Sequence, residues 1–305
     1  MRIAFCLVLT GCSITPFDPD LHVESPFALD DRLPLFSYES FPSDAVTERR
    51  ENDEWILEGP DGVWIAHVRK PASSPSCAIL ILPILGGKYT ITRHFAEVFC
   101  ERGLTTIWVE RRGKLMDPSR DLEASKQAFV EQVVDARRAL DWLDHQNDVI
   151  GNGYGLFGIS RGGIVGSLVA AIDTRIGASV IAIAGGDLPT IVEESTEKEV
   201  VRFRDAQVRR SGYSFDVFRK RARQVFHDVD PLHYAARIEP STCLMIAARF
   251  DSVIPPQCTN ALWQRAGRPR LITFDATHTG IFVFIPYCEK VAAEHYVDVL
   301  LDDPG

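Results

Sequence analysis

The stretch that most constrains the fold of this chain is residues 155–163, with the sequence GLFGISRGG. Apolar, strand-like residues lead into a serine flanked by glycines, and the helical run 164–172 follows. Such a sharp turn puts its central residue in a strained conformation, and the glycines leave room where Cβ atoms would collide. The pattern predicts an exposed nucleophile at Ser160, with the Arg161 N–H as a donor to a developing oxyanion. The alternative is a turn whose serine only caps the helix.

A serine hydroxyl is a weak nucleophile near neutral pH, so it needs a base and a group that orients the base. Asp251 follows the apolar run 244–248, and His278 follows the next strand-like run. The carboxyl ends of parallel strands lie at one edge of a sheet, so both side chains are expected near Ser160. The order serine, aspartate, histidine fits one known class of catalytic triad. Asp187, after the run 178–184, is the alternative acid.

The rest of the chain alternates strand-like and helical patterns. Two β-rich segments flank a Gly-Pro-Asp-Gly turn at 59–62 and predict an antiparallel hairpin. Further strands are expected at 77–82, 105–109, 178–184, 244–248 and 271–274, and helices at 90–102, 126–145 and 287–301. This order predicts an α/β fold, with one mostly parallel sheet covered by helices on both faces.

One insertion interrupts the alternation at about residues 189–238. It contains two expected helices, 197–210 and 214–226, that mix charged and apolar residues. Loops at the carboxyl edge of such a sheet usually shape the site, which favours a lid over the catalytic edge. The alternative is an outer decoration with a solvated charged face.

With these motifs, residues 45–301 resemble the α/β-hydrolase fold superfamily. Residues 160–163 and 139–143 are similar to the dienelactone-hydrolase and prolyl-oligopeptidase-like branch. The resemblance implies that Ser160 attacks an acyl carbonyl and that His278 transfers the proton. Asp251 would hold the imidazole and stabilise its cation.

The resemblance also implies a second oxyanion donor in the loop after the strand 77–82. The superfamily usually has His-Gly at the start of this loop, where this chain has Pro83-Ile84. Counting from the strand end gives the Leu85 N–H the donor's place. Because a backbone N–H needs no particular side chain, the departure affects the residue assignment more than the function.

Several arginines are candidate anchors for an acidic substrate group. Glu110-Arg111-Arg112 ends a strand at the same sheet edge, and we favour an ion pair that pins this loop over a substrate contact. Arg161 and Arg249 lie nearer the expected site, and either is a candidate for contact with a carboxylate or phosphate.

Charge and cysteine spacing exclude several classes of function. The net charge of −9 argues against nucleic acid as the main partner. Seven cysteines without a C-x-x-C motif argue against structural zinc and leave one or two disulfides open. His227 and His233 flank Asp228 and Asp230, but a capped turn is favoured there over a metal site. The sequence therefore predicts an enzyme without metal or cofactor.

The N-terminus predicts a membrane anchor. Met1-Arg2 and the apolar stretch 3–9 precede Leu9-Thr10-Gly11-Cys12, which resembles a bacterial lipoprotein signal and lipobox. Residues 1–11 would then be removed, Cys12 lipidated, and residues 12–44 would form a tether and strap before the domain 45–305. The residue after the cysteine favours the outer membrane within the cell envelope. The alternative is a buried N-terminal strand, and loss of lipidation in a Cys12→Ala variant would decide between the two.

Together these features predict a serine hydrolase, with a carboxylic-ester hydrolase acting on a small-molecule acyl substrate through an acyl-enzyme as the favoured type. A peptidase of the prolyl-oligopeptidase type, an acyltransferase and a non-catalytic envelope binding protein remain alternatives. No propeller-like repeat precedes the domain in this sequence, which argues against the peptidase. The substrate and the oligomeric state are not predicted.

Overall fold

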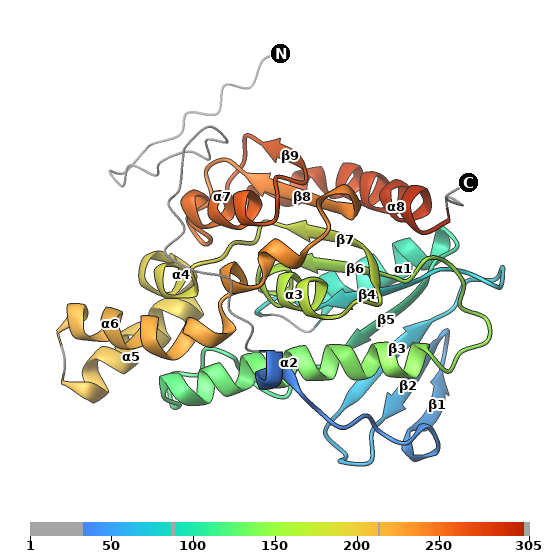
Figure 1. The fold of residues 1–305 in the computed structure, drawn as a ribbon, viewed down its shortest axis with the longest axis horizontal. Coiled ribbons are helices and arrows are strands. Elements are labelled where there is room, and N and C mark those ends of the chain that lie inside the picture. The colour runs from blue at the N-terminus through green and yellow to red at the C-terminus, as the bar shows by residue number, and fades with distance from the viewer. Residues whose placement is uncertain (1–32, 87–88, 213, 302–305) are drawn as a thin grey trace.

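A nine-stranded sheet forms the centre of the computed structural model, which describes residues 33–86, 89–212 and 214–301 (Figure 1). The strand order is β1-β2-β3-β5-β4-β6-β7-β8-β9. The strands are β1 (Thr47–Glu51), β2 (Glu54–Glu58), β3 (Ile65–Arg69), β4 (Ala78–Leu82), β5 (Thr105–Val109), β6 (Tyr154–Ile159), β7 (Ile176–Ala182), β8 (Cys243–Ala248) and β9 (Arg270–Phe274). β5, β4 and β6–β9 pair in parallel, while β1, β2, β3 and β5 pair antiparallel. The predicted mostly parallel sheet and its N-terminal hairpin are confirmed.

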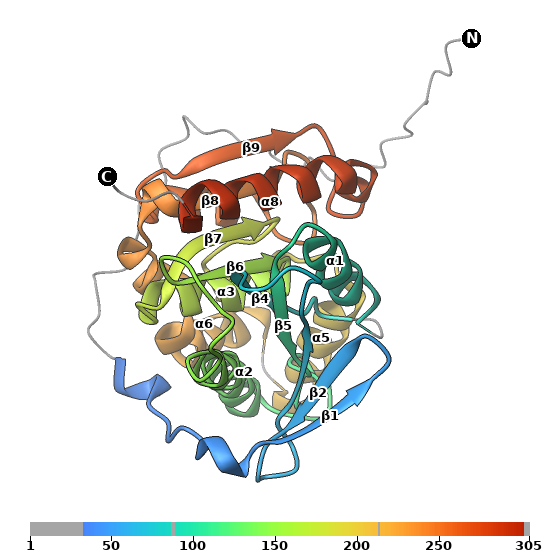
Figure 2. The same ribbon diagram turned by 90° about the vertical axis from the view of Figure 1, so that its right-hand side faces the viewer.

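Helices cover both faces of the sheet (Figure 2). α1 (Thr90–Glu101) and α8 (Ile285–Leu301) pack on one face, and α2 (Leu122–Leu143) and α3 (Arg161–Ile172) pack on the other. β4 and β6, which are buried along their whole length, lie between these layers. Burial on both faces explains why these strands are almost wholly apolar in sequence.

The helix α7 (Pro256–Arg265) was not expected from the sequence. Its residues PQCTNALWQR lack a clear apolar stripe, although Pro256 stands in the first turn, where proline favours a helix start. α7 packs beside β8 and the short 3-10 turns that precede β8. Tertiary packing therefore stabilises a helix whose sequence periodicity is weak.

In the described part of the segment between β7 and β8 there are three α-helices, where the sequence predicted two. α5 (Lys198–Ser211) and α6 (Phe215–Phe226) match the predicted pair within one residue at each end. The additional helix is α4 (Leu188–Glu194), whose seven residues are too few to show a helical period. All three lie at the carboxyl end of the parallel strands (Figure 1).

Residues 33–45 run across the outer surface of α2. Phe36 is buried there, edge-on to Tyr234 at 5.6 Å between ring centroids, and its carbonyl accepts from Arg137 Nη1 at 2.9 Å. The expected signal segment, Cys12 and the first part of the tether lie outside the described residues. Within the described part of the chain, no helix combines the length and hydropathy that a bilayer span requires.

The five cysteines in the described residues are all unpaired, and only Cys100 is not fully buried. Burial raises the pKa of the Cys258 thiol well above its usual value. Such thiols act as small core side chains rather than as nucleophiles.

Candidate active site

Ser160 occupies the sharp turn between β6 and α3, with φ +54° and ψ −121°. A Cβ on Gly158 would collide with the Gly162 carbonyl, and one on Gly162 would collide with the Leu82 carbonyl. The Ser160 N–H donates to the Ala182 carbonyl at 2.8 Å, which fixes the turn to β7. The surrounding backbone therefore holds the serine in a conformation that non-glycine residues rarely adopt.

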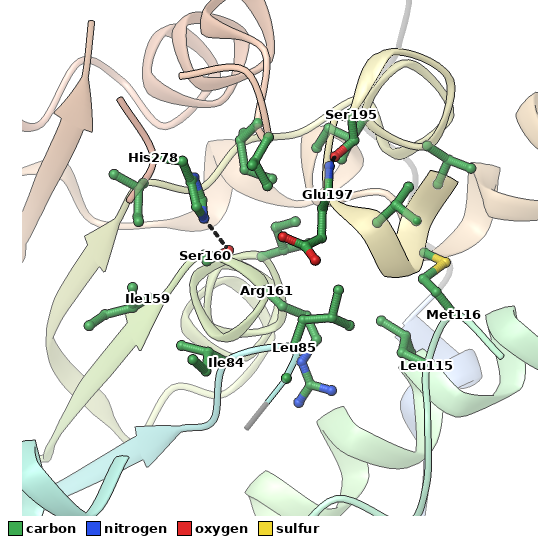
Figure 3. Close-up of a pocket in the computed structure, with 18 of the residues that line it drawn as sticks. Ile84, Leu85, Leu115, Met116, Ile159, Ser160, Arg161, Ser195, Glu197 and His278 are labelled. Atoms are coloured by element: carbon green, nitrogen blue, oxygen red, sulfur yellow. Dashed lines mark hydrogen bonds between the residues drawn. The ribbon is translucent and has the colours of Figure 1, made fainter. Parts of the chain in front are cut away.

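His278 and Asp251 complete a hydrogen-bonded chain with Ser160. His278 Nε2 lies 2.9 Å from Ser160 Oγ, and His278 Nδ1 lies 2.7 Å from Asp251 Oδ2 (Figure 3 shows the first of these contacts). Asp251 is only 2 % exposed. A neutral imidazole that donates its Nδ1–H to Asp251 leaves the Nε2 lone pair free to accept the serine proton.

The loop after β8 orients the Asp251 carboxylate. Its Oδ1 accepts the backbone N–H groups of Val253 and Ile254, both at 2.8 Å, which leaves Oδ2 for His278. These two N–H groups belong to the turn that Asp251 itself begins, so the acid is positioned by its own local sequence.

Asp187, the alternative acid, serves a different purpose. Its carboxylate caps α4, accepting the Thr190 N–H at 3.3 Å and the Thr190 hydroxyl at 2.7 Å. Its nearest cation is Arg223, at 3.6 Å. The structure thus brings Asp251, and not Asp187, to His278.

The residues predicted to supply the oxyanion donors line the cavity that contains the serine. Leu85 and Arg161 line the same cavity as Ser160, and the Arg161 N–H is the first of α3, which has no acceptor within the helix. Arg111, from the end of β5, holds the Leu85 loop: its Nη1 donates to the carbonyl groups of Ile84, Leu85 and Gly86. The guanidinium also packs over the Tyr89 ring at 4.7 Å.

The two arginines of the Glu110-Arg111-Arg112 segment make different kinds of contact. Arg112 pairs with Asp135 and Asp61, with a shortest contact of 2.5 Å to Asp135, and Glu110 Oε1 lies 2.8 Å from His67 Nε2. Arg111 instead holds the neighbouring loop through backbone carbonyls. An ion pair was expected to hold this loop in place. Arg111 holds the neighbouring Leu85 loop instead, and it does so by binding backbone carbonyls.

The Arg161 side chain is buried in the wall of the site. Burial and the nearby Arg111 charge lower its pKa to about 9. Among the described residues, its Nε and Nη1 have no hydrogen-bond partner. Figure 3 shows the guanidinium beside Leu85 and turned away from His278. Arg249, the other candidate anchor, lies outside the cavity lining and pairs with Asp275 at 2.8 Å.

A cavity of about 290 Å³ opens over Ser160 and His278. Most of its wall is aliphatic or aromatic. The segments that contribute to this apolar part include the loop after β4, the loop before α2, the helices α2 to α5, and the segments after β8 and β9. The apolar residues include Ile84, Leu85, Leu115, Met116, Phe129, Leu188, Ile191, Val192 and Val200. The insertion after β7 therefore forms one wall of the site, as its position on the sheet edge predicted.

Glu197 is a lining residue that sequence analysis missed. It stands at the N-cap position of α5, but its carboxylate makes no capping hydrogen bond. Figure 3 shows the side chain entering the cavity with the carboxylate turned toward Ser160. The only signal in the sequence is its place in the insertion, because a helix-start glutamate is ordinarily assigned to capping or to the helix dipole.

The histidine and aspartate cluster at 227–233 forms capped turns. The Asp230 carboxylate accepts the N–H groups of Leu232, Asp187 and Leu188, and Asp228 pairs with Lys126 at 2.7 Å. Within the described residues, no group of three or more histidine, cysteine or acidic side chains is arranged to hold a metal.

Comparison with known proteins gives few relatives by sequence. No family model matches the chain. An uncharacterized protein of Mycobacterium tuberculosis, present in strains CDC 1551 and H37Rv, is 25% identical over 188 residues, which is 61% of this chain and 42% of that protein. The chain thus spans less than half the length of these relatives.

Solved structures give a clearer result. Acetyl xylan esterase from Paenibacillus sp. R4 has a TM-score of 0.63 at 16% identity, covering 82% of this chain and 87% of that one. Pyrococcus horikoshii acylaminoacyl peptidase has a TM-score of 0.60 at 14% identity, covering 85% and 42%. The 2,6-dihydroxy-pseudo-oxynicotine hydrolase has a TM-score of 0.59 at 16% identity, covering 84% and 68%. At these identities the likeness establishes the fold, and this chain has the α/β-hydrolase fold.

Proposed function

We propose that this protein is a serine hydrolase that cleaves carboxylic esters through an acyl-enzyme. One observation carries the proposal: Asp251, His278 and a strained, cavity-facing Ser160 form a continuous hydrogen-bonded chain. The esterases and peptidases among the solved structures that share the fold support the hydrolase class.

In this mechanism His278 Nε2 takes the Ser160 proton as Oγ attacks the ester carbonyl. Asp251 holds the imidazole tautomer and stabilises the imidazolium. The Arg161 and Leu85 N–H groups stabilise the oxyanion, and loss of one such donor typically costs about 3–4 kcal/mol of transition-state stabilisation. His278 then protonates the leaving alcohol. In the second half, His278 takes a proton from water as the water attacks the acyl-enzyme carbonyl, and it returns that proton to Ser160 Oγ as the carboxylic acid leaves.

Labelling with a fluorophosphonate probe tests the proposal. We expect the probe to modify Ser160, as mapped by mass spectrometry, and the label to be lost in His278→Ala. His94→Ala is the matched control, because His94 is exposed and pairs with Glu289 on the α1 and α8 face. Folded wild-type protein that takes no label would refute the proposal. Comparing p-nitrophenyl butyrate with butyryl p-nitroanilide then separates an esterase from a peptidase.

A further inference from the structure

The chemistry of the cavity wall bears on which ester this site accepts. Most of the wall is apolar, and the polar side chains that line it besides Ser160 and His278 are Arg161, Ser195, Glu197 and Thr279. The Arg161 guanidinium lies beside Leu85 and points away from His278 (Figure 3). Glu197 is therefore the acidic group that an incoming substrate meets beside the nucleophile.

The Glu197 carboxylate has no ion-pair or hydrogen-bond partner among the residues that the structure describes. The Glu197 backbone N–H donates to Ser195 Oγ at 3.2 Å. The start of α5 is therefore held by its backbone, and the Glu197 carboxylate takes no part in that contact. A carboxylate that faces apolar surface is costly to desolvate unless it is paired. A group that enters with the substrate can supply that pairing.

We infer that Glu197 selects esters that carry an alkylammonium group close to the scissile carbonyl. This proposal rests on the hydrolase function proposed above and adds a substrate class to the same site. An alkylammonium joins a positive charge, which the carboxylate attracts, to apolar carbons, which suit the aliphatic wall. A sugar ester fits less well, because its hydroxyls would meet Leu188, Ile191 and Val192, which offer no polar side chain.

A matched pair of substrates isolates the charge. Butyrylcholine and 3,3-dimethylbutyl butyrate have the same shape, and they differ in the replacement of a quaternary nitrogen by carbon. A partly desolvated charge pair is expected to give the wild-type enzyme a kcat/KM about tenfold higher for butyrylcholine. The preference should weaken as salt is added, because added ions screen the pair.

Two variants test whether Glu197 causes the preference for butyrylcholine. Glu197→Gln keeps the shape and removes the charge, and it should bring the ratio of the two kcat/KM values close to one. Asp205→Asn is the control: it also removes a carboxylate charge from α5, at an exposed position outside the cavity lining. Asp205→Asn should keep the wild-type ratio. A wild-type ratio near one, or an equal loss of preference in both variants, would overturn the assignment of Glu197.

Binding to Ser160→Ala protein separates this proposal from the proposed function. Isothermal titration calorimetry with the same two esters needs no turnover. Tighter binding of butyrylcholine that is lost in Ser160→Ala/Glu197→Gln would support the cation site even if the wild-type protein hydrolyses neither ester. Hydrolysis of both esters without any preference in rate or binding would leave the hydrolase function standing and refute the cation site.

Discussion

The two walls of the active site are held in place by different means. On the triad side, Ser160, Asp251 and His278 each follow the end of a strand. The Ser160 N–H is held by the adjacent strand β7, and Asp251 is held by N–H groups of its own turn. On the opposite side, the Leu85 loop is held by the side chain of Arg111, which arrives from β5, and the lid is tied down by the buried Asp230. The triad side is fixed by backbone groups of strand ends and turns, whereas the opposite side depends on side chains that arrive from distant segments.

The largest expected effect separates the two aspartates. Asp251→Asn should lower kcat/KM for an ester by about a thousandfold to ten-thousandfold, because the imidazole loses the partner that sets its tautomer. Asp187→Asn should leave both the rate and the free energy of unfolding nearly unchanged, because asparagine keeps the oxygen that accepts the Thr190 N–H and caps a helix about as well as aspartate. Steady-state kinetics and urea unfolding check both values. The reverse pattern would identify Asp187 as the acid.

A smaller effect is expected on the oxyanion side. Arg111→Met removes the side chain that holds the carbonyls of residues 84–86, so the Leu85 N–H loses its fixed position. We expect kcat to fall up to about a hundredfold with little change in KM, because an oxyanion donor acts mainly in the transition state. Arg112→Met is the control, since Arg112 bonds Asp135 and Asp61 and not this loop. An equal loss of kcat in both variants would show that Arg111 has no special link to the oxyanion loop.

The smallest effect concerns the attachment of the lid. Burial raises the pKa of Asp230 to about 7, although three backbone N–H groups act in the opposite direction. A carboxyl whose pKa is higher in the folded state stabilises the fold when protonated, and this stability is lost as pH rises toward 7. Between pH 5 and pH 8 we expect the wild-type protein to lose about 2 kcal/mol through this group.

Asp230→Asn tests that expectation. The variant should be less stable overall, but its free energy of unfolding should change less between pH 5 and pH 8 than that of the wild type. Urea unfolding at the two pH values measures the difference. A variant with the same pH dependence as the wild type would show that Asp230 is ionised in the fold throughout this range.

Most features that depend on short stretches of sequence, such as the buried strands and the residues that follow them, could be predicted. The buried strands β4 to β8 are mostly apolar in sequence. A polar residue a few positions after a strand lies near the sheet's carboxyl edge, which is how Asp251 after β8 and His278 after β9 were found. The helices α4 and α7 were missed, because seven residues or a weak stripe carry no helical period.

The site features that could not be predicted depend on which distant segments pack together in the folded protein. Nothing near Arg111 in the sequence indicates that its guanidinium meets carbonyls more than twenty positions earlier. Glu197 looks like an ordinary helix-start acid until the lid is folded over the sheet. The triad residues could be predicted from their order in the chain. The roles of Arg111 and Glu197 depend instead on which segments become neighbours when the chain folds.

The strained conformation of Ser160 also has an evolutionary consequence. A non-glycine residue held at such dihedral angles costs about 1–3 kcal/mol, while glycine adopts them freely. The folded chain would therefore gain stability by losing its nucleophile, and Ser160→Gly should unfold at higher urea concentration than Ser160→Ala. If so, selection for robustness alone would erode this position, and a serine persists there only while its chemistry is under selection.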